Sequence, residues 1–290
     1  MKICVIGSFC VDYISKTNYK LIKGESHPGS IKVNPGGVAR NIVENLARMN
    51  LDITFITAIG SDYYGQCFKN ELNELNVKIE MPVISNKHET SMYFAINNKE
   101  GNLEYAVVNN DILESINKTY LESKIDYLNS FDYIVLDTNV SIEAIDFLFK
   151  NINVKIIVDA VSMIKSEKLK NYLDKIYILK TNEREFIHLQ QYMNLKKPTH
   201  LIKTMGSKNI VYFYNDEVYE YKPIKKEKIV STTGAGDAFL SGVIYALTMN
   251  KTVKEAIEMG SLFSYYTLDV EEKVNKNIKS LINRHFEFFV

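Results

Sequence analysis

Short apolar runs alternate along this chain with segments in which apolar residues recur at helical spacing, and this alternation constrains the fold most strongly. Phe68, Leu72 and Leu75 mark one helical segment, and residues 142–149 form another. The runs expected to form strands lie at residues 2–7, 53–60, 133–137, 155–159, 176–179, 201–204 and 210–214. Repeated β–α units predict an α/β fold in which helices cover both faces of a mainly parallel sheet.

Two segments interrupt this alternation. Residues 13–33 show no helical period and contain Gly24, Pro28 and Gly29, which favours short strands and turns. Residues 90–108 are rich in strand-forming side chains on both sides of a polar turn, as expected for a hairpin. We expect the two segments to form a small separate sheet. Because a small sheet alone is barely stable, it should pack on the core or on the same sheet of a second subunit.

Composition narrows the class of protein. The chain has 290 residues, of which 46% are hydrophobic, enough for one large domain with or without an appendage. Lys plus Arg and Asp plus Glu balance at 35 each, so no overall field attracts nucleic acid or an anionic membrane. Cys4, Cys10 and Cys67 are widely spaced and form no Cys-x-x-Cys pair. With no apolar run of membrane-spanning length, these features predict a cytoplasmic protein with reduced thiols.

A glycine-rich turn at residues 231–237 runs directly into an apolar helical segment. Gly234, Ala235 and Gly236 leave the first N–H groups of that helix accessible, which favours binding of a phosphate group. Asp237 then has two interpretations: it caps the helix, or its carboxylate accepts a proton from an attacking hydroxyl during phosphoryl transfer. A dinucleotide fingerprint is excluded because Phe239 stands at the third glycine position, and no P-loop is present.

A second glycine-rich turn precedes the helical segment at residues 38–49. Gly36 and Gly37 allow a ligand close to the backbone, and Asn41 offers a donor and an acceptor to a vicinal diol. A simple turn followed by a solvated Asn is an equal alternative. Asp12 follows the first strand, where a carboxylate can bind hydroxyl groups or remain an exposed loop residue.

Polar residues end most of the predicted strands, which predicts one crevice along the carboxyl edge of the sheet. Glu185 begins a helix after the strand at 176–179. It either caps that helix or, with Asn182, holds waters of a Mg²⁺ ion. The polar loop at 225–228 is expected to be solvated surface. In the predicted last helix, 253–268, the small residues Gly260 and Ser261 fit either a nearby purine or close helix packing.

Taken together, Gly36-Gly37-x-x-x-Asn41, Asn182-x-x-Glu185 and Thr233-Gly-Ala-Gly-Asp237 resemble the ribokinase-like (PfkB) carbohydrate kinases over nearly the whole chain. The resemblance implies a three-layer α/β/α core and a small β-sheet lid that closes over the substrate and often pairs between subunits. The chain would then be a homodimer through the lid. The core would comprise residues 1–12, 34–89 and 111–290, and the lid residues 13–33 and 90–110.

The resemblance also implies roles for individual residues. Asp237 would be the catalytic base, beside an anion hole formed by the amides of Gly234, Ala235 and Gly236. The sugar hydroxyls would bind Asp12, Gly36, Gly37 and Asn41. ATP would lie along Thr204, Gly206, Gly234, Gly236 and Asn182, with Asn182 and Glu185 serving Mg²⁺ through water. Ser231 stands where many members have an Asp that supports a monovalent cation site, which argues against a K⁺ dependence.

Residues 26–29, 37–48, 137–139 and 159–165 are similar to the pseudouridine kinase branch of this family. This narrower likeness implies transfer of the ATP γ-phosphate to the 5′-hydroxyl of pseudouridine. Asn139 and Lys165 would contact the base or ribose, with a solvated Lys165 as the alternative. The competing interpretations are a kinase for ribose, fructose or adenosine and a catalytically silent nucleotide-sensing protein.

Overall fold

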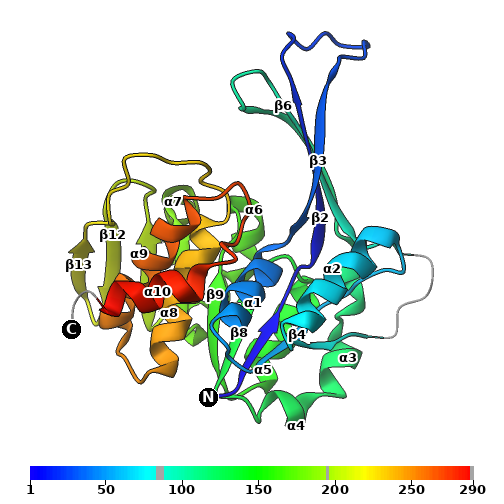
Figure 1. Cartoon of the computed structure of the whole chain (residues 1–290). Coiled ribbons are helices and arrows are strands. Elements are labelled where there is room, and N and C mark those ends of the chain that lie inside the picture. The colour runs from blue at the N-terminus through cyan, green and yellow to red at the C-terminus, as the bar shows by residue number, and fades with distance from the viewer. Residues whose placement is uncertain (83–87, 194–195, 288–290) are drawn as a thin grey trace.

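A computed structural model describes residues 1–82, 88–193 and 196–287, and in this part of the chain the strands form two sheets (Figure 1). The large sheet has the order β13-β12-β11-β10-β9-β8-β1-β4-β5. Its strands are β1 (Ile3–Ile6), β4 (Ile53–Ile56), β5 (Lys78–Glu80), β8 (Tyr133–Asp137), β9 (Lys155–Asp159), β10 (Ile178–Asn182), β11 (His200–Thr204), β12 (Ile210–Tyr214) and β13 (Glu217–Tyr221). All pair in parallel except the β11–β12–β13 edge, which is antiparallel.

Helices cover both faces of the large sheet because successive strand side chains point to opposite faces. In β1, Ile3 and Val5 join one apolar core, whereas Cys4 and Ile6 join the other. The first core includes side chains from α1 (Val38–Arg48), α2 (Tyr63–Glu74), α8 (Ala235–Thr248), α9 (Val253–Thr267) and α10 (Ile278–Glu287). The second includes α3 (Lys118–Glu122), α4 (Ile125–Leu128), α5 (Ile142–Asn151) and α7 (Glu183–Gln190), with α6 (Met163–Ser166) nearby in the chain.

The small sheet has the order β3-β2-β6-β7 and rises away from the core in Figure 1. It consists of β2 (Cys10–Thr17), β3 (Gly29–Gly36), β6 (Ser91–Asn97) and β7 (Leu103–Asn109). The predicted α/β core with a separate small sheet is therefore confirmed. Strand β2 begins before residue 13 and β3 ends after residue 33, the bounds expected for the first of the two segments. The reason is that β2 continues almost directly from β1 and that β3 leads into α1.

Three expectations about individual elements need correction. The helix expected to be the last, α9, is followed by α10. Strand β13 was not expected, although it extends the β12 edge of the sheet as a hairpin. In the loop at 225–228, the other three residues are exposed as expected, but Lys226 is partly buried, and its Nζ donates to the carbonyl of Tyr265 at 2.9 Å and pairs with Asp269 at 2.6 Å. Gly260 has a packing role, since a Cβ there would lie 2.8 Å from the carbonyl oxygen of Phe239.

Candidate active site

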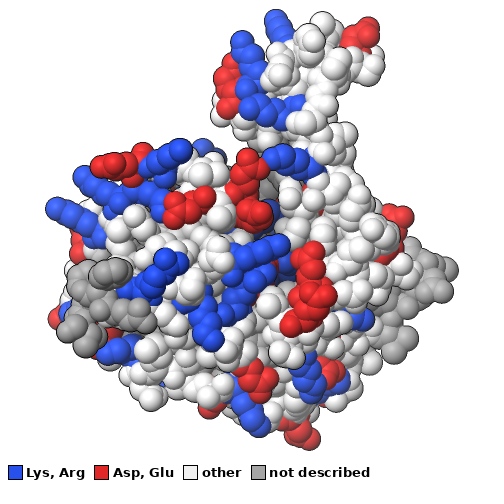
Figure 2. Space-filling model, viewed as in Figure 1, with Lys and Arg blue, Asp and Glu red and all other residues white. Residues whose placement is uncertain are grey.

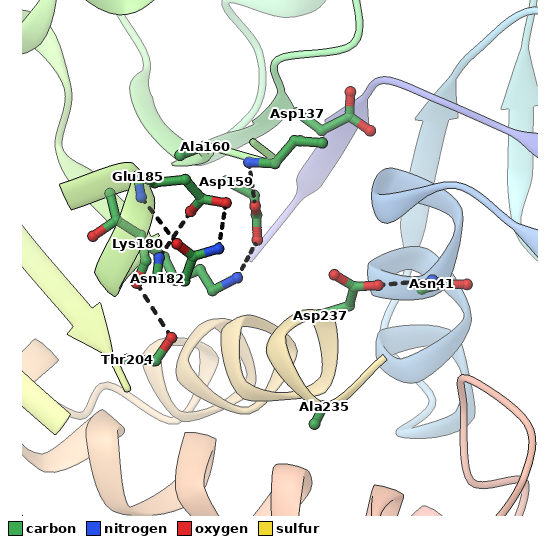
Figure 3. A network of polar contacts seen from close by, with 12 residues as sticks. Asn41, Asp137, Asp159, Ala160, Lys180, Asn182, Glu185, Thr204, Ala235 and Asp237 are labelled. Carbon is green, nitrogen blue, oxygen red and sulfur yellow. Dashed lines mark hydrogen bonds and ion pairs between the residues drawn. The ribbon is translucent and has the colours of Figure 1, made fainter. Parts of the chain in front are cut away.

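The two glycine-rich turns open α1 and α8, and the fold brings these helix starts together (Figure 3). Asn41, in the first turns of α1, donates from Nδ2 to Oδ2 of Asp237 at 2.7 Å. Asp237 is the third residue of α8, whose N-cap is Gly234. Residues separated by almost two hundred positions in the sequence thus share one hydrogen bond. The predicted hydroxyl-binding Asn41 and the predicted proton acceptor Asp237 are therefore in direct contact.

The turn that precedes α8 has a backbone that only glycine adopts without strain. Gly234 has a φ of 82°, and a Cβ at this position would overlap the carbonyl group of Lys273. The same reasoning applies to Gly37 at the start of α1, with a φ of 96° and the carbonyl of Ser8 against it. No side chain of either N-cap residue caps its helix. At α1, however, the N–H groups of Ala39 and Arg40 already donate to Asp137 Oδ2 at 3.0 Å and to the carbonyl oxygen of Ser8 at 3.1 Å. At α8, the N–H of Ala235, predicted to be an accessible anion-hole donor, instead donates to the carbonyl oxygen of Thr232 at 3.3 Å. The positive dipole end of α8 still favours an anion.

A buried ion pair that the sequence did not predict lies next to the turn that precedes α8. Lys180 Nζ on β10 donates to Oδ2 of Asp159 on β9 at 2.9 Å, and the two side chains are 8% and 2% exposed (Figure 3). A Cβ on Gly236 would lie 2.9 Å from the same Nζ. The ammonium group therefore lies directly beside the turn proposed to hold phosphate. Its only signal in the sequence is a lysine within an otherwise apolar run.

The charges around Asp237 perturb its acidity. Burial, and then the charge of Asp159, raise the pKa of Asp237 to about 7, although Lys180, the Asn41 hydrogen bond and Lys273 act to lower it. Burial would lower the pKa of Lys180, but the Asp159, Asp237 and Glu185 carboxylates outweigh that effect and raise it. A carboxylate that titrates near neutral pH is suited to accept and release a proton at physiological pH.

Asp12 pairs with Lys273, a residue that sequence reasoning also missed. Asp12 lies on β2, and Lys273 lies in the connection between α9 and α10. The two side chains are 10% and 13% exposed. Gly36 lies against this pair, since a Cβ on it would be 2.8 Å from Lys273 Nζ. Nothing in the local sequence around Lys273 indicates this long-range partner.

Asp137 holds three elements together rather than facing a ligand. Its Oδ2 accepts from the backbone N–H and hydroxyl of Ser8 at 3.0 and 2.6 Å and from the N–H of Ala39 in the first turn of α1 at 3.0 Å. Asn139 Nδ2 donates to the same Ser8 hydroxyl at 3.0 Å. Lys165 Nζ donates to Asn139 Oδ1 at 2.5 Å. The predicted base- or ribose-contacting residues Asn139 and Lys165 are therefore bonded to each other.

Asn182 and Glu185 form a capping box at the start of α7. Asn182 Oδ1 accepts from the N–H of Glu185 at 3.0 Å, and the Glu185 carboxylate accepts from the N–H and Nδ2 of Asn182 at 2.8 and 2.6 Å. Burial raises the pKa of Glu185, with Lys180 acting against it. Glu185 therefore caps α7, which was one of its two predicted roles. Direct metal coordination fits poorly, because both carboxylate oxygens already accept hydrogen bonds, whereas contact through water remains compatible with their second lone pairs.

The remaining predicted ATP-site residues follow β11. Thr204 Oγ1 donates to the carbonyl of Thr181 at 3.2 Å. Gly206 has a φ of 60°, and a Cβ there would meet no atom within 4 Å, so its backbone is open to a ligand. Within residues 1–82, 88–193 and 196–287, no group of three or more His, Cys, Asp or Glu side chains is placed to hold a metal ion.

A family model described as pfkB family carbohydrate kinase matches residues 1–272. The chain is 28% identical to a pseudouridine kinase of Escherichia coli strain K12, covering 95% of this chain and 93% of that protein. It is 24% identical to a guanosine-inosine kinase of Exiguobacterium acetylicum, covering 89% and 91%.

Solved structures show the same fold. A carbohydrate kinase from Agrobacterium tumefaciens superposes with a TM-score of 0.83 at 24% identity, covering 98% of this chain and 96% of that one. A ribokinase from Thermotoga maritima superposes with a TM-score of 0.85 at 19% identity, covering 98% and 99%. No helix in the described part of this chain is long and apolar enough to cross a membrane.

Proposed function

The chain belongs to the pfkB family of carbohydrate kinases, and from this premise we propose that it transfers the γ-phosphate of ATP to the 5′-hydroxyl of pseudouridine. Membership makes it a sugar or nucleoside kinase, a phosphotransferase with an alcohol as acceptor. The choice of pseudouridine is supported by the similarity to a pseudouridine kinase along nearly the full length of both chains.

The observation that carries the kinase mechanism is the contact between Asn41 and Asp237 at the junction of the two helix starts. Asp237, as an ionised carboxylate, accepts the proton of the attacking hydroxyl while Asn41 fixes the carboxylate's orientation. The amides of Gly234 and Gly236 and the α8 dipole would stabilise charge on the transferred group, whereas the N–H of Ala235 already donates to the carbonyl oxygen of Thr232. Because phosphoryl transfer passes through a loose transition state, this positioning accounts for most of the catalysis.

Lys180 is placed to assist on the phosphate side. Its ammonium group lies against Gly236 and is held by Asp159 from below. It therefore supplies positive charge next to the amides, and it favours the ionised form of Asp237. Mg²⁺ bound with ATP would supply further positive charge to the phosphates, and Asn182 and Glu185 would hold it through water. A K⁺ requirement is not part of this proposal, since Ser231 supplies no carboxylate to such a site.

At the acceptor side, Asp12, Gly36, Gly37 and Asn41 would hold the ribose hydroxyls, and the linked pair Asn139–Lys165 would contact the base or ribose. The small sheet, which carries Asp12 on β2, projects from the core (Figure 1 and Figure 2), and its closure over a bound acceptor would exclude water from the reaction. A cytoplasmic location, where ATP and pseudouridine are both accessible, belongs to the same proposal.

We further propose that the small sheet pairs with that of a second copy. Alternate side chains on its outer face are apolar and exposed, including Ile31 at 64%, Tyr105 at 65% and Val107 at 71%. They continue a face to which Tyr13 and Phe94 also belong, with ring centroids 6.2 Å apart. A contiguous apolar face of this kind is typical of a protein–protein contact.

The test of the acceptor is mass-spectrometric detection of phosphorylated product from a mixture of pseudouridine, uridine, inosine, adenosine, ribose and fructose with Mg-ATP. A product of pseudouridine alone supports the proposal. Preferential phosphorylation of inosine would instead point to the specificity named for the guanosine-inosine kinase relative. ATP binding with no phosphorylated product from any acceptor would favour a nucleotide-sensing protein.

A further inference from the structure

The Asp12–Lys273 ion pair lies where the proposed acceptor must bind, and its second member has no assigned role. The pair joins β2 of the small sheet to the connection between α9 and α10. Both side chains are nearly buried, so little water screens the two charges. Glu271, two residues before Lys273, pairs with Lys32 on β3 at 2.5 Å, which ties the same connection to the small sheet a second time.

The backbone around Lys273 fixes the position of its ammonium group. The next two residues, Val274 and Asn275, are 2% and 3% exposed, and Asn275 Nδ2 donates to the carbonyl of Tyr266 at 2.7 Å. On the other side, a Cβ on Gly234 would lie 2.8 Å from the Cα of Lys273. The residue is therefore wedged between the phosphate-binding turn and the proposed acceptor subsite. Its charge also acts to lower the pKa of Asp237, as expected for a group in the same crevice.

A neutral acceptor is poorly suited to displace this lysine. Separating the two members of a nearly buried ion pair leaves an uncompensated charge. The free-energy cost of that charge is far larger than the stabilisation from the hydrogen bonds of one hydroxyl. We therefore expect the pair to persist when the acceptor binds. Together the two groups offer a carboxylate that accepts hydrogen bonds and an ammonium with three donors. A vicinal diol, in which each hydroxyl both donates and accepts, is complementary to such a pair.

We propose that Lys273 is a specificity-determining residue that, together with Asp12, binds the vicinal diol of the acceptor's ribose. This inference rests on the proposed function in one respect, that the acceptor binds at Asp12; it does not depend on which base the nucleoside carries. Gly36 is required here because any side chain on it would overlap Asp12 and approach the ammonium group.

The test combines variants with acceptors that lack one hydroxyl. Steady-state kinetics are measured for the wild type, Lys273→Met and Lys273→Arg with pseudouridine and its 2′-deoxy and 3′-deoxy forms. Lys276→Met, which removes an exposed lysine from the same connection, is the matched control. Calorimetric titration with the same acceptors, without ATP, separates binding from turnover. Melting temperatures show whether each variant is folded.

A hydrogen bond from a charged donor predicts that Lys273→Met raises the KM for pseudouridine about 10- to 100-fold and leaves the KM for ATP unchanged. The wild type should discriminate against at least one deoxy acceptor by a similar factor, and that discrimination should largely disappear in Lys273→Met. Lys273→Arg should retain part of it, and Lys276→Met all of it. If Lys273→Met does not fold, the double variant Asp12→Asn with Lys273→Met, compared with Asp12→Asn alone, takes its place because it leaves no unpaired carboxylate.

Three results would overturn the inference: unchanged discrimination between diol and deoxy acceptors in Lys273→Met, a KM for the acceptor that falls because the lysine had blocked the subsite, or no binding of any diol-bearing acceptor to the wild type. If another ribose-bearing acceptor such as inosine replaces pseudouridine as the substrate and the lysine effect persists, the diol contact stands and the proposed substrate fails.

Discussion

Replacing Lys180 with Met tests whether the buried ion pair beneath α8 controls the base. Methionine keeps the length and apolar stem of the side chain but removes its charge. In the wild type, Lys180 is the foremost influence that lowers the pKa of Asp237, against burial and Asp159, which raise it to about 7. Without Lys180, the Asp159 carboxylate also loses its partner. Both changes disfavour the ionised form of Asp237, so its pKa should rise.

The size of the shift follows from the position of the ammonium group. Lys180 Nζ lies 2.9 Å from where a Cβ of Gly236 would be, next to Asp237 in the chain. A separation on the order of 6 Å and an effective dielectric constant of about 20 give an interaction of about 3 kcal/mol, or about two pKa units. Relaxation and water entry into the site reduce this figure. We therefore expect a rise of at least about one unit.

The assay is the initial rate of ADP formation between pH 5.5 and 9 with both substrates below saturation, where the profile reports the free enzyme. In the wild type the rate should fall about tenfold per pH unit below the pKa of Asp237, because only its ionised form accepts the proton. For Lys180→Met the falling limb should move to higher pH, whatever happens to the plateau. Lys155→Met is the control with the same change in net charge, because Lys155 begins β9 whereas Asp159 ends it. Superimposable normalised profiles for Lys180→Met and wild type would refute the reasoning.

Three further predictions concern the α8 turn and the small sheet. Asp237→Asn should lower kcat about 10²–10⁴-fold with little change in KM. It should also raise the melting temperature more at pH 8 than at pH 5, because the raised folded-state pKa of Asp237 means that the wild type loses stability as the pH rises toward about 7. An equal gain at both pH values would contradict the assigned pKa. Gly234→Ala should lower kcat and destabilise the protein beyond Gly101→Ala in urea unfolding, because both have positive φ but only the former has backbone within contact of the added Cβ; equal losses would show that φ strain alone is felt. Val107→Lys should shift the mass measured by light scattering from dimer to monomer, whereas Glu104→Lys on the opposite face should not, and a wild-type monomer would rule out pairing through this sheet.

The elements that carry the site follow from local sequence because each has a local cause. Glycine at positions 37 and 234 is required by the positive φ of the local turn, and the apolar periods behind these turns specify the helices. The alternation of strands and helices then places the carboxyl ends of the parallel strands at one edge. Such features can be recognised in a single sequence, since they depend on neighbouring residues only.

The residues that sequence reasoning missed have long-range causes. Lys180 pairs with Asp159 on the neighbouring strand β9, and Lys273 pairs with Asp12 near the other end of the chain. A lysine in an apolar run marks Lys180 as unusual but does not name its partner, and nothing local marks Lys273. Lys226, expected in a solvated loop, is likewise fixed by α9 and the residues that follow it. Glu185 shows the opposite case, because its capping role is local and was correctly among the alternatives.

The two lysines that sequence reasoning missed place one positive charge on the phosphate side of the candidate site and another on its acceptor side. Lys180 is paired from below and lies beside the phosphate turn, whereas Lys273 is paired with the carboxylate at the acceptor end. Each positive charge is thus held by a buried carboxylate before any substrate arrives, so neither has to be reorganised when phosphate or diol binds. Asp237 accepts a hydrogen bond from the Asn41 amide, and both lysine charges act to lower its pKa. Burial and the charge of Asp159 raise the pKa of Asp237 to about 7, so this carboxylate can take up a proton near neutral pH.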